Sequence, residues 1–286
     1  MVPILLDGKS LSDKIYNDLT EVRGKLHKMH GDYKLIVMTV GDDAASKVYV
    51  RNKIKACERL GIIHEHITVD ESISSDDFAE MLIKLMEDNP NNTGIILQLP
   101  APKHLADIFD KTIEGKFGVD GFDFTNKTLL YTCEHPFYYP ATPKGIMLLL
   151  SNYNIGLEGK HVVILGRSEI VGKPLAKIMM DENATVTVCH SKTQNLSEIT
   201  KTADIIVAAI GKPKFINSSH IKDGVVIVDV GINRTEEGLC GDVDFDDVYS
   251  KCSAITPVPG GVGPMTVCAL MENVLCSSMY RNDLDE

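Results

Sequence analysis

The sequence predicts an α/β protein of two domains, in which parallel strands alternate with helices. Short runs rich in β-branched residues recur between segments of helix length along most of the 286 residues, a pattern typical of βαβ units. One run, 161–165, ends at Gly166, and a second glycine, Gly172, opens the segment that follows. Such a turn lets backbone N–H groups approach a phosphate at the positive end of a helix dipole. A chain of this length suffices for two medium domains.

The first part of the chain predicts one α/β domain. Its expected elements are a strand at 35–40, a helix from about 43 to 60 ended by Gly61, a strand at 64–69, a helix from Ser74 or Ser75 to Met86, and a strand at 94–99. Asp76 and Asp77 favour the start of the second helix, because acidic side chains stabilise the positive end of a helix dipole.

The segment from 112 to 140 differs, because it is rich in Gly, Phe, Tyr and Pro and lacks a regular period. We expect a long functional loop here and a crossing to the second domain. Beyond it, the expected elements are a helix from Pro143 to about Tyr153, strands at 161–165, 185–189, 205–209 and 225–230, and helices at 173–182 and 196–202. This spacing predicts a Rossmann-like, doubly wound parallel sheet with helices on both faces.

The predicted domain boundaries follow from this order of elements. Residues 1–140 form the first, catalytic domain, and residues 141–263 form the second, dinucleotide-binding domain. A last helix, from Pro264 to about Met279, is expected to return to the first domain, so that residues 264–286 belong to it.

Composition excludes several classes of function. A net charge of −11 disfavours nucleic acid as a partner, because phosphate backbones require a basic surface. The seven cysteines are odd in number and contain no C-x-x-C pair, which favours a reducing compartment and argues against disulfides or a zinc site. The start lacks a signal-peptide pattern, and no apolar run approaches the ~20 residues of a membrane span. We therefore expect a cytoplasmic protein without metal or membrane partner.

The residues around the glycine turn indicate which dinucleotide binds. Arg167 and Ser168 stand in the turn, and the next strand ends at His190-Ser191. An NAD-type fold usually ends this strand in an acid that holds the ribose hydroxyl, and no acid stands there. A guanidinium and a hydroxyl favour a 2′-phosphate, so NADP is expected over NAD. Because the spacing is not G-x-G-x-x-G, a purely structural turn stays open as the alternative.

Lys53 is the most unusual residue of the predicted helix 43–60. On a helical wheel an apolar stripe runs through Val50, Ile54, Cys57 and Leu60. Lys53 falls inside this stripe, and Tyr49 lies one turn before it. Desolvation lowers the pKa of a lysine and allows it to donate or accept a proton. The alternative is a lysine that snorkels along the stripe to water.

Three other features point to a ligand, each with a plainer alternative. Gln98 ends a buried strand, where α/β sheets bind ligands, and the alternative is an edge amide that faces solvent. Asp120 is suited to accept two N–H bonds from an amidine-like heterocycle edge, or to form an Asx turn before Gly121. The proline- and glycine-rich segment 256–266 permits close approach of a flat ligand, or is a turn between domains.

In this order and spacing, the motifs resemble the bifunctional methylenetetrahydrofolate dehydrogenase/methenyltetrahydrofolate cyclohydrolase family. The resemblance runs from about residue 5 to residue 276 and rests on segments 46–53, 94–102, 119–122, 141–145, 166–174, 189–193 and 256–266. It implies a cytosolic NADP-dependent enzyme of one-carbon metabolism, which supplies purine and amino-acid biosynthesis, and a homodimer of two-domain protomers with a cleft between the domains. It also implies two reactions: oxidation of 5,10-methylenetetrahydrofolate to 5,10-methenyltetrahydrofolate, and hydrolysis of that product to 10-formyltetrahydrofolate.

The resemblance implies roles for individual residues. Lys53 is the proton-handling catalytic residue, Tyr49 positions the substrate beside it, Gln98 tunes Lys53, and Asp120 holds the pterin ring. The folate pocket is lined by Tyr49, Leu99, Pro100, Asp120, Pro259, Gly260 and Gly261. Residues Gly166, Arg167, Ser168 and Ser191 surround the NADP phosphate and ribose groups, and Ile232 touches the nicotinamide side.

The chain departs from the family pattern around the folate loop. Lys116-Phe117-Gly118 stands where the family commonly has Lys-Asp before Val-Asp-Gly, Asp123 and Phe124 replace His and Pro, and Ala141 replaces a Cys. These changes put the detail of the substrate loop in question rather than the reaction class.

Three other functions stay open from the sequence. One is a member of the family that only dehydrogenates. Another is an NADP-linked dehydrogenase of a small hydroxy acid, although only His190 stands near a strand end as its acid–base centre. The third is a non-catalytic nucleotide sensor, which would lack the inward polar cluster.

Overall fold

The structure, a computed structural model, describes residues 2–132, 134–236 and 238–279 and forms two compact units. The six-stranded unit comprises the residues up to Lys14 and Thr142–Thr266. The three-stranded unit comprises Ile15–Ala141 and the chain from Val267 on. The functional boundaries at 140 and 263 stay predictions.

The sheet of the three-stranded unit is parallel, with the strand order β3-β2-β4. Its elements are β2 (Lys34–Val40), β3 (Ile63–Val69), β4 (Thr93–Leu97), α2 (Ala44–Leu60), α3 (Ser75–Asp88), α4 (Lys103–Thr112) and α5 (Phe124–Tyr131), joined by most of α1 (Gly8–His30) and α10 (Val262–Cys276). Because β2 lies at the centre and is buried along its length, its run of apolar residues packs on both faces.

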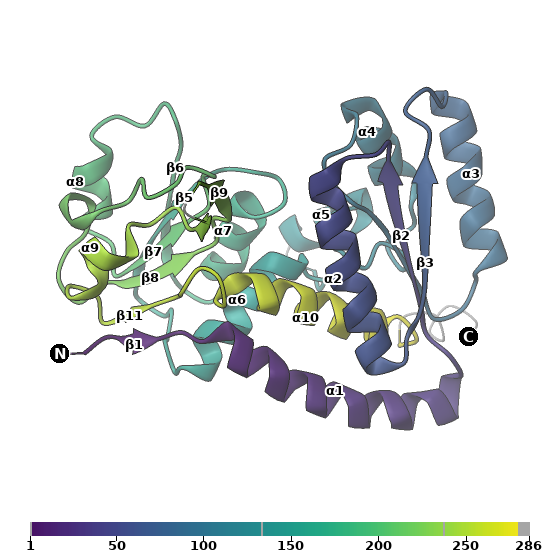
Figure 1. Cartoon of the computed structure of the whole chain (residues 1–286), viewed down its shortest axis with the longest axis horizontal. Coiled ribbons are helices and arrows are strands. Elements are labelled where there is room, and N and C mark those ends of the chain that lie inside the picture. Colours follow the sequence, from purple (N-terminus) through teal and green to yellow (C-terminus); the bar gives the residue numbers. More distant parts are fainter. Residues whose placement is uncertain (1, 133, 237, 280–286) are drawn as a thin grey trace. The chain divides into compact units, whose positions relative to one another are not determined.

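Alternate residues of β2 enter two separate cores. Leu35 and Val37 pack against residues of α2 and α10, whereas Ile36 and Met38 pack against Phe78 and other residues of α3 and α4. Figure 1 shows α2 and α3 on opposite sides of β2 and β3. The last helix therefore packs in the unit that holds the first predicted domain, which confirms the expected return of the chain.

The sheet of the six-stranded unit is parallel, with the order β1-β11-β8-β7-β5-β6. Its strands are β1 (Ile4–Leu5), β5 (His161–Leu165), β6 (Thr185–Cys189), β7 (Ile205–Ala208), β8 (Val226–Asp229) and β11 (Ala254–Ile255). From β5 the chain first adds β6 on one side of that strand, and it then returns to add β7, β8 and β11 on the other side of β5. The strand order thus reverses at β5, and ligands of such sheets bind at the carboxyl ends of strands at this switch point.

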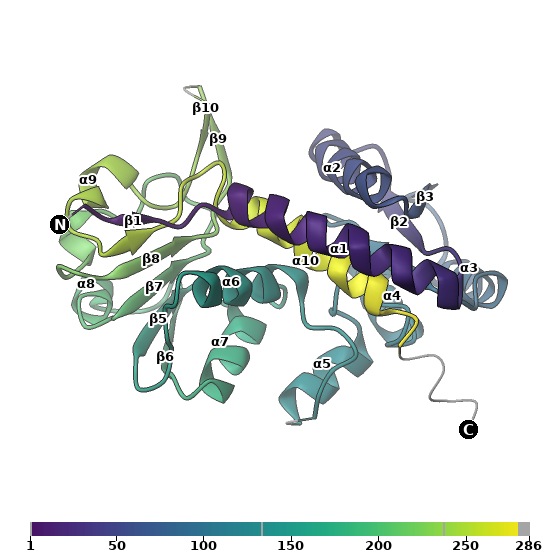
Figure 2. The same cartoon turned by 90° about the horizontal axis from the view of Figure 1, so that it is seen from below.

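Helices cover both faces of this sheet, as predicted. Figure 2 shows α6 (Ala141–Asn152) and α7 (Gly172–Asp181) on one face and α8 (Leu196–Thr200) and α9 (Phe245–Tyr249) on the other. The cores agree, because Val162 and Ile164 pack with α6 and α7, whereas Val163 and Leu165 pack on the other side. A hairpin of β9 (Asn233–Thr235) and β10 (Gly238–Cys240) and a short 3₁₀ helix, η1 (Ser218–His220), complete the unit.

Helix α2 begins and ends where the sequence predicts. The Asp43 carboxylate accepts the backbone N–H of Ser46 at 2.7 Å and caps the first turn. Gly61 closes the helix with φ of 66°, a left-handed conformation that favours glycine. Ser74 caps α3 in the same way, through the N–H of Asp77. Asp43 and Gly61 therefore fix the two ends of α2, the helix that carries Lys53.

Several elements differ from the sequence prediction. The segment expected to be one long loop contains α5, whose first turn is capped by the Asp123 carboxylate through the N–H of Asn126 at 2.9 Å. The sequence also did not predict α1, and it did not predict β1, which pairs with β11. Helix α10 begins at Val262, so Pro264 lies inside its first turn.

The described residues also bear on membranes, disulfides and metals. Within the described ranges no helix has both the length and the apolar content that a bilayer span requires. No disulfide joins the six cysteines that the structure describes, and Cys133 lies outside these residues. Nor do the described residues group three His, Cys, Asp or Glu side chains in a way that fits a metal ion.

Candidate active site

Lys53 lies on α2, inside the apolar stripe, and its amine points to an amide rather than to bulk water. Its Nζ donates a hydrogen bond to Gln98 Oε1 at 2.6 Å. Gln98 follows β4 and is only 9% exposed, so it is not a solvent-facing edge amide. Its own Nε2 donates to Leu99 O at 2.7 Å, and this bond turns the amide oxygen toward the lysine. Helix α2 and the end of β4 therefore fix a lysine–amide pair.

The electrostatic environment shifts the pKa of two groups toward neutrality. Burial lowers the pKa of Lys53 to about 8, against the opposing effect of the negative charge on Asp120. Burial raises the pKa of Asp120 to about 7, and the charge of Asp123 raises it further, while Lys53 opposes the rise. A lysine and a carboxyl group that interact and titrate near neutral pH are suited to donate and accept protons.

Asp120 forms the Asx turn that was one of its two predicted geometries. Its Oδ1 accepts the backbone N–H of Phe122 at 3.3 Å, a weak Asx turn that orients the carboxylate. The same carboxylate interacts electrostatically with Lys53. The turn therefore positions Asp120 and does not exclude a ligand-binding role.

Apolar groups at the exposed end of this cluster provide a surface for a flat ligand. Tyr49, one turn before Lys53 on α2, is 44% exposed. Leu99 and Pro100 follow Gln98 and are also exposed, and the peptide bond between them is cis. The three-stranded unit thus contains all of the predicted residues Tyr49, Lys53, Gln98, Leu99, Pro100 and Asp120, of which Lys53 interacts with both Gln98 and Asp120.

The departures around the folate loop have structural explanations. Phe117 is buried in the core beneath β4, and its carbonyl accepts the N–H of Ile95 at 2.8 Å. Asp123 is 1% exposed, and its Oδ2 accepts Asn126 Nδ2 at 2.6 Å. Ala141 is buried, whereas Phe124 is 61% exposed on α5. Asp123 was not among the predicted site residues, yet it caps α5 and its charge raises the pKa of Asp120. An Asp three residues before Asn126 is a helix-cap signal that the sequence offered.

The turn between β5 and α7 brings backbone segments into unusually close contact. Gly166 has φ of 116°, and a Cβ on it would lie 2.2 Å from Ala209 O. A Cβ on Gly172 would lie 2.2 Å from Gly166 O. Ser168 Oγ accepts the N–H groups of Val171 and Gly172 at 3.2 and 3.4 Å, so it shapes the start of α7. Only glycine fits at 166 and 172, as a phosphate-binding turn requires.

Arg167 and Ser191 follow neighbouring parallel strands at the same edge of the sheet. Leu165 of β5 pairs with Cys189 of β6, and the N–H of Gly166 donates to Cys189 O at 2.9 Å. Arg167, Ser168 and Ser191 are exposed, and Ile232, after β8, is 47% exposed. An exposed guanidinium and two hydroxyls beside a close-approach turn fit the phosphates and ribose of NADP.

Pro259, Gly260 and Gly261 form a turn at the start of α10 in the six-stranded unit. Gly260 has φ of 108°, and its carbonyl accepts the N–H of Lys9 at 2.8 Å. A Cβ on Gly261 would lie 2.6 Å from Pro257 O, so the turn requires glycine there.

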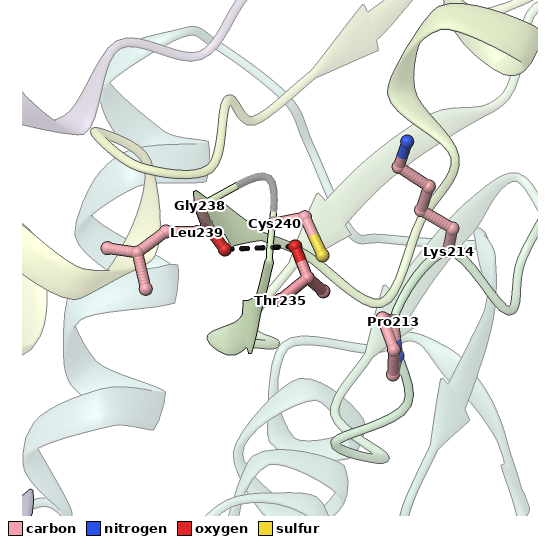
Figure 3. Close-up of a pocket in the computed structure, with 6 residues that line it drawn as sticks. All are labelled: Pro213, Lys214, Thr235, Gly238, Leu239 and Cys240. Carbon is pink, nitrogen blue, oxygen red and sulfur yellow. Dashed lines mark hydrogen bonds between the residues drawn. The ribbon is translucent and has the colours of Figure 1, made fainter.

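A surface pocket of about 300 Å³ lies apart from all of these residues. Figure 3 shows the side chains that line it, on the hairpin of β9 and β10 and on the loop that contains Pro213 and Lys214. Thr235 Oγ1 donates to Gly238 O at 3.1 Å within it. None of the predicted site residues lines this pocket.

A switch-point glycine turn in one α/β unit and a partly buried lysine–amide pair in the other define an NAD(P)-linked enzyme with a separate catalytic unit. Two family models support this class. The catalytic domain of tetrahydrofolate dehydrogenase/cyclohydrolase matches residues 6–113, and its NAD(P)-binding domain matches residues 140–282. The chain belongs to the tetrahydrofolate dehydrogenase/cyclohydrolase family, which confirms the resemblance predicted from its motifs.

Individual relatives are similar along almost their whole length. The "Bifunctional protein FolD" of Agathobacter rectalis is 50% identical over 273 residues, which cover 94% of this chain and 96% of the relative. A crystal structure of the bifunctional enzyme FolD from Campylobacter jejuni is 44% identical, with a TM-score of 0.92, and the match covers 97% and 99% of the two chains. The Trypanosoma brucei enzyme, solved with NADP cofactor and inhibitor, is 31% identical with a TM-score of 0.90, over 98% of each chain.

Proposed function

We propose that this protein is an NADP-dependent methylenetetrahydrofolate dehydrogenase and methenyltetrahydrofolate cyclohydrolase. It oxidises 5,10-methylenetetrahydrofolate to 5,10-methenyltetrahydrofolate and hydrolyses that product to 10-formyltetrahydrofolate. The observation that carries this proposal is the Lys53 amine, held 2.6 Å from Gln98 Oε1 with a pKa lowered to about 8, in a chain of this family.

The three-stranded unit supplies the residues that hold the folate. The Asp120 carboxylate accepts two N–H bonds from the amidine-like edge of the pterin, a paired geometry that carboxylates favour. Tyr49, Leu99 and Pro100 offer exposed apolar surface to the flat ring. We also assign Pro259, Gly260 and Gly261, which form the turn at the start of α10, to folate binding.

The six-stranded unit holds NADP+, which when bound accepts the hydride from the methylene carbon. Gly166 and Gly172 allow the backbone to approach the pyrophosphate, because a side chain at either position would meet the main chain. Arg167, Ser168 and Ser191 bind the 2′-phosphate and ribose. Ile232 packs against the nicotinamide side and excludes water from it.

Lys53 carries the protons of the hydrolytic step. Water adds to the methenyl carbon, and the neutral amine of Lys53 accepts a proton from it. The hydroxyl group on that carbon then releases its proton to solvent and becomes the formyl C=O as the bond between the carbon and N5 breaks. The ammonium of Lys53 returns its proton to N5, so that one proton is released overall. Gln98 Oε1 holds the amine in place throughout, since it accepts a hydrogen bond from either protonation state.

The setting of the enzyme is part of the same proposal. We infer a cytoplasmic homodimer whose one-carbon product supplies purine and amino-acid biosynthesis. Residues 1–140 with 264–286 act as the catalytic domain, and residues 141–263 act as the NADP domain. The odd number of cysteines and the lack of a C-x-x-C pair in the sequence support a reducing compartment.

The test is a spectrophotometric assay of the purified protein with methylenetetrahydrofolate and either NADP+ or NAD+. We expect NADPH and a methenyl absorbance that then decays faster than without enzyme, with NADP+ preferred. A member that only dehydrogenates would leave the decay rate unchanged. A hydroxy-acid dehydrogenase or a nucleotide sensor would give no turnover of the folate.

A further inference from the structure

The carboxylate of Asp242 is fully buried and accepts four hydrogen bonds. Its Oδ2 accepts the backbone N–H groups of Ile210 at 2.6 Å and Gly211 at 3.0 Å. Its Oδ1 accepts the N–H of Lys212 at 2.8 Å and Asn233 Nδ2 at 2.9 Å. One side chain therefore ties the loop after β7 to the segment after β8.

A second buried carboxylate holds Asp242 itself in place. Asp229, the last residue of β8, accepts the N–H of Asp242 at 3.0 Å and that of Val243 at 2.9 Å. A Cβ on Gly231 would lie 2.2 Å from Asp242 Oδ1, and a Cβ on Gly241 would lie 1.8 Å from Asp229 Oδ2. The glycines on both sides are therefore needed for the two carboxylates to fit.

The loop that Asp242 holds lies at the switch point of the sheet. Ala209 follows β7, and its carbonyl is the atom that a Cβ on Gly166 would meet at 2.2 Å. The N–H of Ala209 donates to Leu165 O at 2.8 Å, so this loop packs directly beside the glycine turn. The segment tied by Asn233 carries Ile232, the residue assigned to the nicotinamide side.

We propose that Asp242 is a positioning residue of the dinucleotide site, which holds the loop after β7 against the glycine turn and fixes the Ile232 segment beside it. This inference rests on the proposed use of NADP. The carboxylate touches no cofactor atom and acts through the backbone that it orients. Four donors directed at one buried carboxylate set a single loop conformation before the cofactor arrives, which removes an ordering cost from binding.

The substitution D242N tests this role. Asparagine keeps the shape of the side chain but turns one acceptor oxygen into an N–H donor, which then faces backbone N–H groups. We expect the Kd for NADP+, measured by calorimetry, to rise at least tenfold, with the KM for the folate within twofold of wild type. The matched control is D246N, the same substitution at an exposed position in the first turn of α9, which should leave both values unchanged.

A second variant, N233A, tests the same role with a smaller change, in case D242N fails to fold. N233A removes only the contact to Oδ1 and keeps the three backbone bonds, so we expect a rise of about threefold in the Kd for NADP+ with an unchanged circular dichroism spectrum. Unchanged NADP+ affinity in both folded variants, or in N233A if D242N does not fold, overturns the inference. Equal losses of folate and NADP+ binding overturn it too, since they indicate a structural role. If wild type itself does not bind NADP+, the proposed function fails instead.

Discussion

Position 53 is occupied by a lysine where the packing of α2 calls for an apolar residue. Val50 and Cys57, one turn on either side, are almost completely buried. A charged amine in such a place lowers stability unless it is hydrogen-bonded, and Gln98 supplies that bond. The residue is therefore costly for the fold and useful for proton transfer, as expected at a catalytic position.

This cost predicts how stability depends on pH. Below pH 8 the amine of Lys53 is charged in the folded and the unfolded chain, whereas between pH 8 and 10.5 the folded chain releases its proton first. Stability therefore rises with pH in this window. The difference in unfolding free energy between wild type and K53M should therefore shift in favour of wild type by about 1–3 kcal/mol when the pH is raised from 7 to 10. Denaturant titration at the two pH values measures this difference.

The comparison uses K55M as its control, because Lys55 is exposed on the same helix. K53M also loses the hydrogen bond to Gln98. This loss lowers stability at both pH values, so the test rests on how the stability difference changes with pH and not on its size at one pH. A difference between wild type and K53M that does not vary with pH would show that the amine is not desolvated.

At the scale of elements, the first turn of α5 controls the charge near Asp120. Asp123 caps this helix and is buried, and its negative charge raises the pKa of Asp120. The variant D123N keeps an oxygen that caps the helix and removes the charge. The pKa of Asp120 should then fall.

The expected result is a shift in the acid limb of folate binding. The proposed contact to the pterin requires the ionised form of Asp120. The pH at which 1/KM for the folate falls to half should therefore move down by about 0.5–1 unit in D123N. The profile is measured between pH 5 and pH 8, with D88N as a control, because Asp88 is an exposed carboxylate at the end of α3 in the same unit. An acid limb at the wild-type pH would contradict the coupling between the two carboxyl groups.

The close packing of the turn between β5 and α7 leads to a second prediction. In G166A the new Cβ would meet Ala209 O, and alanine at φ of 116° is strained. We expect a loss of at least ~2 kcal/mol in stability and a more than tenfold rise in the KM for NADP+. The control G156A adds a methyl group where nothing lies within 4 Å and φ is not left-handed. Wild-type NADP+ kinetics in G166A would refute a phosphate-binding turn.

The elements that the sequence predicted share a local signal. Strands β2, β5 and β7 are continuous apolar runs, and α2 and α3 carry both an apolar stripe and a capping residue. The elements that it missed lack such a signal. Strand β1 has two residues and gains its identity only from β11, about 250 residues away in the chain. Helix α5 depends on the cap at Asp123 rather than on an apolar period.

The same division applies to the candidate site. Lys53 was found because helical periodicity placed it on a buried face, and Gly166 because a glycine between strand and helix is a local pattern. Asp242 was not found, because the N–H groups that it accepts come from a loop about 30 residues earlier in the chain. Hydrogen bonds over such separations leave no periodic trace in the sequence.

At the scale of the whole molecule, the two units divide the chemistry between them. The proton-handling residues lie in the three-stranded unit and the dinucleotide turn lies in the six-stranded unit. The segments β1 and α10 show that this division does not follow chain order, since the first strand joins the six-stranded sheet and the last helix packs mainly in the other unit. In the proposed function, the dinucleotide turn serves the oxidation and Lys53 serves the hydrolysis.

The most direct measurement follows methenyl absorbance and NADPH together after methylenetetrahydrofolate and NADP+ are mixed with wild type or K53M. Wild type should form NADPH and a methenyl signal that decays enzymatically. In K53M, any methenyl formed should decay only at the rate seen without enzyme, while K55M should behave as wild type. Clearance of the methenyl signal by K53M at the wild-type rate would show that Lys53 does not carry the hydrolytic step.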